Sequence, residues 1–403
     1  MANPRSKKKS THTTDSTGTQ VVPVGAITGG VDTHKQFHVA AAKDSLGRDL
    51  GTERFDATQA GYTQLLAWLQ AFGPLEAVGI EGTGCYGAGL TTHLLEHGVT
   101  VVEVNRPNRQ KRRRTGKSDV KDAIAAAAAV QSGDATAAPR PRTGPVESVR
   151  VIKETRDHLV KARTAALNLL HDLIVTAPPA LRETLTDMTT KVLIGHCAEF
   201  TAPALPAKHS RGHTRAHATT QLTESLLDSP TTTRMMLGDL ARTIQHYDTR
   251  LAELTRCLHT LLTRIAPRTS ALFGVGPGHA AQLLLTAGDH PDRVHSEAAF
   301  AALTGTAPQD CSSGNNHSHH RLSRAGDRQA NSTLYYIVLT RLAHHHPTRD
   351  YITTRLRPGT KMTKKHLIRC LKRYLAREIY PHLMADLTNL TNLTKQATPT
   401  IAA

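Results

Sequence analysis

The sequence predicts an α/β domain at the N-terminal end, followed by a helical connector and a mainly α-helical C-terminal domain. Residues 25–105 contain short β-rich runs separated by helical patterns. Residues 147–175 and 234–265 carry apolar side chains at helical spacing over long stretches. Residues 268–385 combine helical patterns with a Gly-rich turn and a polar loop. These three observations define the parts of the chain.

The boundaries follow from changes in composition along the chain. The expected parts are a disordered basic leader at 1–24, the α/β domain at 25–133, a Pro-rich linker at 134–146, a helical connector at 147–267, a C-terminal domain at 268–385 and a tail at 386–403. The near-heptad spacing of the second long helix fits a helical hairpin or a coiled coil, and an ordinary helical bundle is the alternative.

The charge balance points to a polyanionic partner. The 403 residues include 50 Lys and Arg against 33 Asp and Glu, which gives a formal charge of +17 and a pI of about 9.9. Nucleic acid is the most common polyanion for a protein this basic. A generally basic soluble protein is the alternative, but the basic residues cluster at 106–117 and 355–377.

Cysteine usage and hydropathy predict a cytoplasmic protein with no membrane partner, and a nucleic-acid partner would make it nucleoid-associated. The five cysteines are scattered and show no CxxC spacing, which is typical of a reducing compartment and provides no zinc site. The basic N-terminus has no apolar core after it, unlike a secretory signal. No run approaches the ~20 apolar residues that a membrane-spanning helix needs.

The α/β domain has the element order of the ribonuclease H-like fold. Residues 25–44 are β-rich with Asp32 inside the first strand, and GRDLGTERFD (47–56) is expected to supply the second and third strands. The remaining elements are expected to be a helix at 57–72, a buried strand ending in Glu81, a helix at 86–97, a strand at 100–105 and a helix at 122–130. In this order, acidic residues from the first strand, the fourth strand and a late helix converge.

Four acidic residues occupy those positions: Asp32, Glu81, Asp119 and Asp122. Asp is depleted in strand interiors, so Asp32 either has a functional role or caps the following turn. Glu81 ends a buried strand beside a Gly-rich turn, with capping of the next helix as its alternative role. Asp119 and Asp122 are three residues apart, one turn of a helix. Converging carboxylates are suited to Mg²⁺ (or Mn²⁺), which either activates a nucleophile or positions a phosphate for another group to attack.

Basic residues that would hold phosphate lie in two clusters. They are Arg112, Arg113, Arg114 and Lys117 before the acidic helix, and Lys364, Lys365 and Arg369 in the basic helix at 355–377. A solvated basic surface is the alternative for that helix. The segment ALFGVGPGHAAQLLLTAG (271–288) has the form of a helix-hairpin-helix turn, and its backbone amides could meet a phosphate, although ordinary helix capping explains it too.

A polar loop in the C-terminal domain carries a candidate nucleophile. Ser312 and Ser313 precede Gly314, and the loop also contains Arg321 and Arg324. A serine hydroxyl is a weak nucleophile unless a base or metal activates it. The basic neighbours favour a phosphate target over an acyl one, because neither a GxSxG elbow nor a Ser-His-Asp order is present. A plain polar turn is the alternative.

Together these motifs resemble one family. GVDTHK contains Asp32, GIEGTG contains Glu81, and KSDVKDA contains Asp119 and Asp122. LFGVGPGHAAQLL and TGTAPQDCSSGNNHSHHRLSRAGDRQANSTLYY follow in the C-terminal half. The chain is similar to DEDD transposases of the insertion sequence 110 (110/116/902) family, which include pilin-gene invertases. The resemblance covers roughly residues 28–130 and 268–345, with the helical connector matched by position.

The resemblance implies a RuvC-like domain that holds Mg²⁺ on the four acidic residues, a coiled-coil connector used for assembly, and a nucleophilic serine. The nucleophilic serine of the family corresponds to Ser313 in this resemblance, and Ser312 is the less favoured candidate. The implied partners are DNA at the element ends and target, a structured non-coding guide RNA, and further copies of the chain in a dimer or tetramer with composite sites. The loop NNHSHH departs from the usual Gly- and Lys/Arg-rich pattern, which weakens the expected phosphate contacts there.

These observations predict a transposase that cleaves and rejoins DNA through a phosphoserine intermediate, with Mg²⁺ stabilising the leaving oxygen. Because a covalent intermediate retains the bond energy, no ATP is needed. One alternative is a hydrolytic nuclease resembling Holliday-junction resolvases, in which water attacks. The other is a nucleic-acid-binding protein whose active site is lost.

Overall fold

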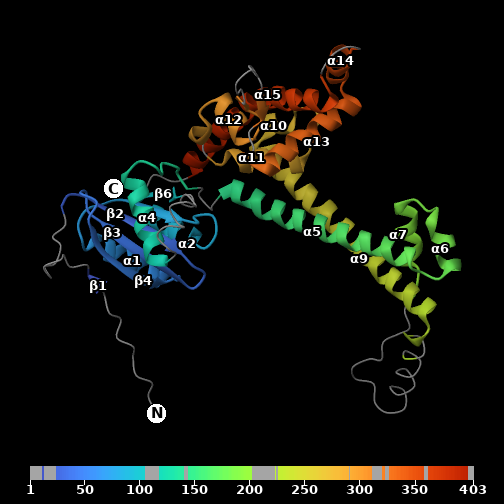
Figure 1. The fold of residues 1–403 in the computed structure, drawn as a ribbon, viewed down its shortest axis with the longest axis horizontal. Helices are drawn as coiled ribbons and strands as arrows, with labels where there is room; N and C mark the ends of the chain where they lie inside the picture. The colour runs from blue at the N-terminus through green and yellow to red at the C-terminus, as the bar shows by residue number, and fades with distance from the viewer. Residues whose placement is uncertain are drawn as a thin grey trace, which may run out of the picture. The chain divides into compact units, whose positions relative to one another are not determined.

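The structure is a computed structural model. It describes residues 11–12, 24–104, 118–139, 144–201, 223, 226–289, 291–310, 320–322, 326–357 and 362–397. The chain divides into two compact units, Met1–Gly144 and Pro145–Ala403, each with its own core. The prediction of an α/β N-terminal part followed by a helical part is confirmed (Figure 1).

A mixed β-sheet forms the centre of the first unit. Its strands are β2 (Ile27–Thr33), β3 (Phe37–Lys43), β4 (Asp49–Asp56), β5 (Leu75–Glu81) and β6 (Thr100–Val104). The first three form an antiparallel meander, whereas β5 lies parallel to β2, and β6 lies parallel to β5. The prediction that residues 47–56 supply two strands is wrong, because Asp49–Asp56 forms one strand and Phe37–Lys43 supplies the other.

Helices cover both faces of this sheet, and two adjacent glycines show how closely they pack (Figure 1). A Cβ on Gly29 would meet Leu69 of α1 (Gln59–Gln70), whereas a Cβ on Gly30 would lie 2.2 Å from the Ala123 carbonyl oxygen of α4 (Asp119–Gln131). Successive residues of a strand face opposite sides, so α1 and α4 lie on opposite faces. The third helix, α2 (Ala88–Glu96), packs its Leu90 and Leu94 into the same core as α1.

Two further segments join this sheet at its edges. Thr11–His12 forms a short strand, β1, antiparallel to β4, so the expected disordered leader contains this strand. The strand order across the sheet is therefore β1-β4-β3-β2-β5-β6. In the expected linker, Ala137 forms an isolated bridge with Glu103 of β6.

Two long antiparallel helices open the second unit. They are α5 (Gly144–Val175) and α9 (Ser229–Ile265). Arg163 pairs with Asp248, and Arg156 Nε donates to Thr255 Oγ1 over 3.0 Å, which sets the antiparallel register. At one end, α6 (Pro179–Thr186) and α7 (Thr190–Ala198) share a small apolar core with both helices. At the other end, the helix pair enters the C-terminal core.

The C-terminal core is built from short helices around one long one. The short elements are α10 (Pro267–Ser270), α11 (Pro277–Ala287), a 3-10 turn (Pro291–Val294), α12 (Glu297–Leu303), α13 (Arg328–His344) and α14 (His346–Arg355). The turn between α10 and α11 contains Gly274 at φ +81°, a conformation that glycine adopts without strain. The segment expected to form a helix-hairpin-helix turn lies here, and its second helix, α11, begins at Pro277.

The long helix α15 (Lys364–Ala397) extends well beyond the basic helix that the sequence predicts. Its Leu367, Leu371 and Leu375 are buried, as their spacing predicts. Leu387 and Leu390 are also buried in the same core, so the expected tail is helical as far as Ala397. The basic segment also begins in a different element, because Arg355 ends α14. None of the described helices is long and apolar enough to cross a membrane.

Candidate active site

The end of β2 and the start of α4 bring two of the predicted acidic residues together. Asp32 is the penultimate residue of β2, and its register partner on β3 is Val39. Ser118 caps α4 by accepting a hydrogen bond from the Lys121 amide at 3.3 Å, so the helix begins at Asp119. The predicted helix start at 122 is therefore three residues late.

The α4 helix reaches Asp32 because the sheet beneath it lacks side chains at two positions. Gly30 allows the backbone of α4 to contact β2, and a Cβ on Gly79 of β5 would lie 2.7 Å from the Ala126 carbonyl oxygen. Ala123, Ala126 and Ala127 fill this contact and are buried. The glycines and alanines therefore set the height of α4 above the sheet, and with it the position of Asp119.

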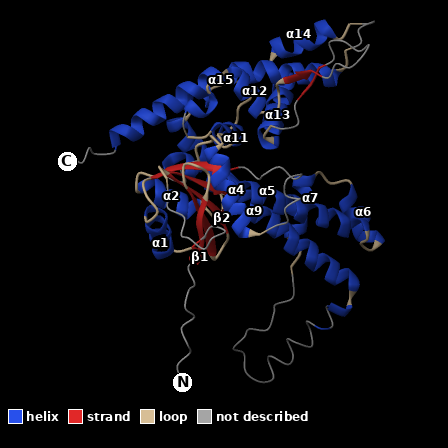
Figure 2. Ribbon diagram, turned by 60° about the vertical axis from the view of Figure 1, so that its left-hand side comes forward, coloured by secondary structure: helices blue, strands red, loops and turns tan. Residues whose placement is uncertain are grey.

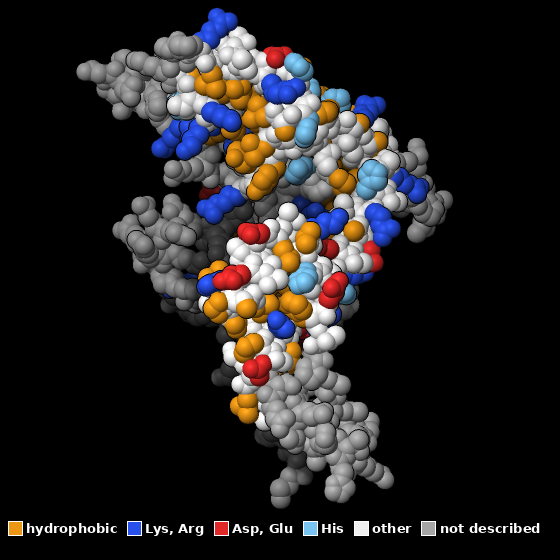
Figure 3. Space-filling model, turned by 90° about the vertical axis from the view of Figure 1, so that its right-hand side faces the viewer, with side chains coloured by type: hydrophobic (Ala, Val, Ile, Leu, Met, Phe, Trp, Pro, Cys, Tyr) orange, Lys and Arg blue, Asp and Glu red, His pale blue; other side chains and the backbone are white. Residues whose placement is uncertain are grey.

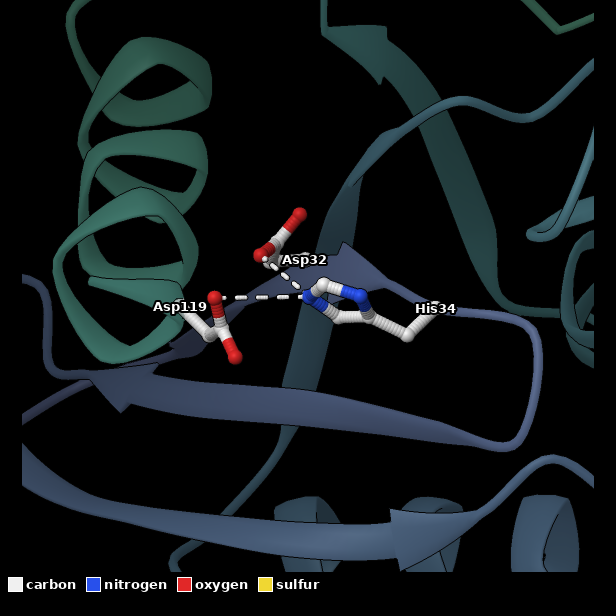
Figure 4. Close-up of side chains that lie close together, drawn as sticks. All are labelled: Asp32, His34 and Asp119. Atoms are coloured by element: carbon white, nitrogen blue, oxygen red, sulfur yellow. Dashed lines mark ion pairs between the residues drawn. The ribbon is translucent and has the colours of Figure 1, made fainter. Parts of the chain in front are cut away.

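A histidine lies between the two carboxylates (Figure 4). His34 Nε2 is 3.3 Å from Asp32 Oδ2 and 3.4 Å from Asp119 Oδ1. One ligand atom from each of Asp32, His34 and Asp119 lies within 4.8 Å of the others. The ring of His34 stacks on Phe37 with centroids 4.8 Å apart, which fixes its plane. This is the one group among the described residues whose donor atoms converge enough to hold a metal ion.

The other two predicted acidic residues flank this group. Asp122 lies one turn along α4 from Asp119 and is only 8% exposed. Glu81 ends β5, the strand next to β2, and its backbone carbonyl accepts a hydrogen bond from Thr33 Oγ1 at 2.8 Å. That bond joins the ends of the two strands. All four predicted acidic residues thus come from elements that meet at one end of the sheet, although Glu81 and Asp122 are outside the three-residue group.

The electrostatics of the group are those of crowded carboxylates. Burial is the largest cause that raises the pKa of Asp32, and the nearby charges of Asp122 and Asp119 raise it further, whereas His34 lowers it. A carboxyl group with a raised pKa is one whose negative charge is poorly compensated. A divalent cation would compensate that charge, so Asp32, Asp119 and His34 form a donor set that fits a metal ion.

Sequence reasoning missed the role of His34, which it considered only as part of a turn after Asp32. The available signal was its position two residues after Asp32, directly past the end of the strand. The approach of His34 to Asp119 could not be predicted from the sequence, because it depends on how closely α4 lies against β2.

The serine loop and several predicted basic residues lie outside the described residues. These are Ser312 and Ser313, together with Arg112, Arg113, Arg114, Lys117 and Arg324. The segments that flank residues 311–319 are described: β7 (Pro308–Asp310) and β8 (His320–Leu322) pair as an antiparallel hairpin, the smaller strand pair in Figure 2.

Backbone contacts bring together the two ends of the longer segment that includes this hairpin. A Cβ on Gly326 would lie 2.3 Å from the backbone nitrogen of Gly305, so these two glycines pack directly against each other. Asn331 Nδ2 donates to the carbonyl oxygens of Thr304 at 2.8 Å and Gly305 at 3.0 Å. Its Oδ1 accepts a hydrogen bond from the buried Lys372 Nζ at 2.8 Å. We call this arrangement the loop neck.

The remaining predicted basic residues divide into two groups. Lys364 and Lys365 are exposed in the first turn of α15. Arg369, one turn further along, and Arg321 of β8 both line a cavity between the hairpin and α15. The structure therefore brings together Arg321 and Arg369, which are far apart in the sequence.

Two family models match the chain. The first is described as a transposase, the DEDD transposase domain of IS110 elements, and matches residues 29–179. The second is described as the transposase IS116/IS110/IS902 family and matches residues 267–353. No relative was found among curated proteins. Both models define a transposase, a protein that acts on DNA.

The chain belongs to the IS110 family of transposases. The first match begins within β2 and extends to the start of α6, so it covers Asp32, Glu81, Asp119 and Asp122. A DEDD domain implies dependence on a divalent metal, and the Asp32, His34 and Asp119 group is the candidate place for it.

Proposed function

We propose that this transposase cleaves and rejoins DNA strands with Mg²⁺ (or Mn²⁺) and a serine nucleophile, Ser313. The observation that carries the proposal is the convergence of Asp32, His34 and Asp119, with Asp122 near enough to raise the pKa of Asp32. The strand order β4-β3-β2-β5-β6, with α4 over the sheet, supports the RuvC-like ribonuclease H assignment.

Asp32, His34 and Asp119 would hold the metal ion, and the stacking of His34 on Phe37 limits the rotation of its ring. When bound there, the ion would supply positive charge to a phosphate and to a departing oxygen. Asp122 and Glu81 orient or add to this set from the next helical turn and the adjacent strand. In the covalent step, Ser313 Oγ bonds to phosphorus, the bond to the deoxyribose oxygen breaks, and the serine proton passes to a base. Rejoining reverses these steps.

The loop neck supports the role proposed for Ser313. A nucleophile needs a fixed approach to its target, and a rate loss of orders of magnitude accompanies small misplacements. Asn331 fixes the backbone at Thr304 and Gly305, and Asp327 accepts hydrogen bonds from the Gln329 amide at 2.8 Å and from Thr286 Oγ1 at 2.7 Å. Both flanks of the serine segment are thus anchored to the helical core.

Assembly and guidance complete the proposal. The long helices α5 and α9 expose apolar side chains, including Val151 at 50% and Leu169 at 48%, that would be covered in a dimer or tetramer through a coiled coil. Composite sites would then combine the acidic residues of one copy with the serine of another. An element-encoded RNA would select the DNA by pairing with it.

Trapping of a covalent adduct tests the serine mechanism. The full chain is incubated with Mg²⁺ and DNA that contains an element end, and adducts are separated on a denaturing gel. We expect an adduct with the wild type, none with Ser313→Ala, and none with Asp32→Asn. Ser312→Ala is the matched control and should keep the adduct. Cleavage by Ser313→Ala at the wild-type rate would instead establish a hydrolytic nuclease, and no cleavage or metal binding by the wild type would establish an inactive binding protein.

A further inference from the structure

A cavity of about 720 Å³ lies between the β7–β8 hairpin and one face of α15. The helix contributes residues at positions i, i+3, i+4, i+7, i+8 and i+11, which share one side of a helix. These residues are His366, Arg369, Cys370, Arg373, Tyr374 and Arg377. The buried Leu367, Leu371 and Leu375 lie on a different side, so α15 uses one side for the core and another for the cavity.

The cavity is strongly basic. Arg321 from the hairpin and Arg369, Arg373 and Arg377 from α15 line it, and the described lining includes no carboxylate. The positive charge of Arg373 is paired with Glu297 of α12, which is not part of the cavity lining. Arg373 Nη2 lies 2.9 Å from Glu297 Oε2. Within the described residues, Arg369 and Arg377 form no ion pair, and both are exposed. The cavity therefore offers guanidinium groups that a phosphate could bind.

The cavity also has an apolar and aromatic part. Pro308 and Leu322 of the hairpin and Tyr374 of α15 contribute to its lining. Tyr374 is 47% exposed, and Tyr351 approaches its ring edge-on with centroids 5.7 Å apart. An edge contact of this kind supports the ring and leaves aromatic surface accessible.

We propose that this cavity binds an unpaired nucleotide of a nucleic acid strand, with its phosphate on Arg369 and Arg377 and its base against Tyr374. Arginine with an exposed aromatic ring is the combination that recognises single strands, because each base has a face that can stack. A paired base inside a duplex cannot reach a concave site of this kind. The volume lies within the range of about 300–1,000 Å³ that is common for small-ligand sites.

The charge of the molecular surface and the place of the hairpin in the chain fit the same ligand. On the face drawn in Figure 3, Lys, Arg and His side chains lie among hydrophobic ones in the upper part of the view, where acidic side chains are sparse. Residues 308–310 and 320–322 flank the segment with Ser313, so the hairpin that lines the cavity is adjacent in the chain to the proposed nucleophile. The inference rests on the proposed function in one respect: it takes the bound strand to be a substrate or a guide of transposition.

Binding of short labelled strands tests this site without requiring catalysis. The full chain is titrated in EDTA with a fluorescent single strand of about eight nucleotides and, separately, with a hairpin duplex of the same sequence. Tyr374→Ala should weaken binding of the single strand about ten-fold and that of the duplex less than about two-fold. Tyr374→Phe should bind like the wild type.

Charge is tested in the same assay. Arg377→Gln should lower the dependence of log K on log salt by about 0.7 for the single strand, the value for one phosphate contact. Tyr336→Ala and Arg182→Gln, which remove an exposed tyrosine and an exposed arginine outside the cavity, should leave both quantities unchanged. If Tyr374→Ala does not fold, Tyr374→Leu keeps apolar contact with Tyr351 and lacks the aromatic face.

Equal losses for duplex and single strand, or no loss with Tyr374→Ala and Tyr374→Leu, would overturn the proposal. DNA and RNA strands of one sequence distinguish the two sources of the nucleotide, and selective loss with either supports the site. Because the assay contains no divalent metal and scores no cleavage, it can succeed where the serine mechanism fails, and the reverse is also true.

Discussion

At the scale of single residues, His34 defines the metal group more than any residue that the sequence singled out. Its Nε2 lies 3.3 and 3.4 Å from the two carboxylates that it separates. An imidazole among carboxylates changes which ion is preferred, because nitrogen ligands suit Mn²⁺ and later transition metals better than Mg²⁺. The site should therefore distinguish Mn²⁺ from Mg²⁺, the two ions that the proposed function allows.

His34→Ala is expected to weaken Mn²⁺ binding about ten-fold and Mg²⁺ binding less than about three-fold, because the lost ligand is nitrogen. Titration calorimetry on the full chain measures both. Gln36→Ala, which changes an exposed side chain two residues away, is the control. An equal loss for the two ions would show that His34 acts through the carboxylates and does not bind the metal.

A second histidine has a structural consequence. His38 is fully buried, its ring stacks on Tyr62 with centroids 5.6 Å apart, and among the described residues neither ring nitrogen has a hydrogen-bond partner. Burial lowers the pKa of His38 from 6.5 to about 4. The unfolded chain therefore binds a proton at pH values where the folded chain does not.

The contribution of neutral His38 to the free energy of unfolding should consequently be complete above about pH 6.5. It should be lost as the pH falls from 6.5 toward 4. The His38 contribution is about 2 kcal/mol between pH 7 and 5. Denaturant unfolding at both pH values, compared between wild type and His38→Phe, isolates this contribution from that of the carboxylates. If both proteins lose the same free energy on acidification, the burial of a neutral His38 is not the cause.

At the scale of elements, the contact between α4 and the sheet controls the site. Gly30 is the closest point, where an added Cβ would lie 2.2 Å from the Ala123 carbonyl oxygen and 2.3 Å from the Ala127 amide nitrogen. Backbone atoms cannot move aside as a flexible side chain can. Any larger residue must lift the helix and separate Asp119 from Asp32.

Gly30→Ala is expected to lower the free energy of unfolding by about 1–3 kcal/mol and to weaken metal binding, because the helix carries half of the acidic residues. Thermal unfolding and calorimetry measure the two effects. Gly195→Ala in α7 is the matched control, since a Cβ there meets nothing within 4 Å. Normal metal affinity in a folded Gly30→Ala variant would mean that the site adapts to a shifted helix.

The same elements show what the sequence could predict. Alternating apolar runs and turn residues predict the order of strands and helices around Asp32 and Glu81, because these signals are local. Gly29 and Gly30 lie inside the predicted first strand, but the sequence does not show that they admit helices on both faces. The C-terminal tail resembles a frayed segment in sequence, but Leu390 is buried in the core. Tertiary packing there overrides a weak helix propensity.

At the scale of the whole molecule, the proposed chemistry is divided between two units. The acidic residues belong to the unit that ends at Gly144, and the serine belongs to the unit that begins at Pro145. A division of this kind allows the two halves of a site to come from different copies of the chain. It also makes the composite arrangement accessible to a simple mixing experiment.

Asp32→Asn and Ser313→Ala are each expected to be inactive alone, whereas their mixture should recover part of the wild-type strand exchange, because some assemblies contain an intact pair of half-sites. Gel analysis of recombined DNA measures the recovery. A double variant that carries both substitutions, mixed with an excess of wild type, controls for simple dilution. Complete inactivity of the mixture would place both halves in one copy.

The loop neck has a consequence for how the family can diversify. Gly305 and Gly326 meet backbone to backbone, so the chain between them begins and ends at one fixed point of the core. The entropy needed to close such a segment grows slowly with its length, by about 0.6 kcal/mol for each doubling. Insertions in this stretch therefore cost the helical framework little free energy. The segment around the serine, which contains the NNHSHH run, can therefore differ in length without refolding the domain that carries it.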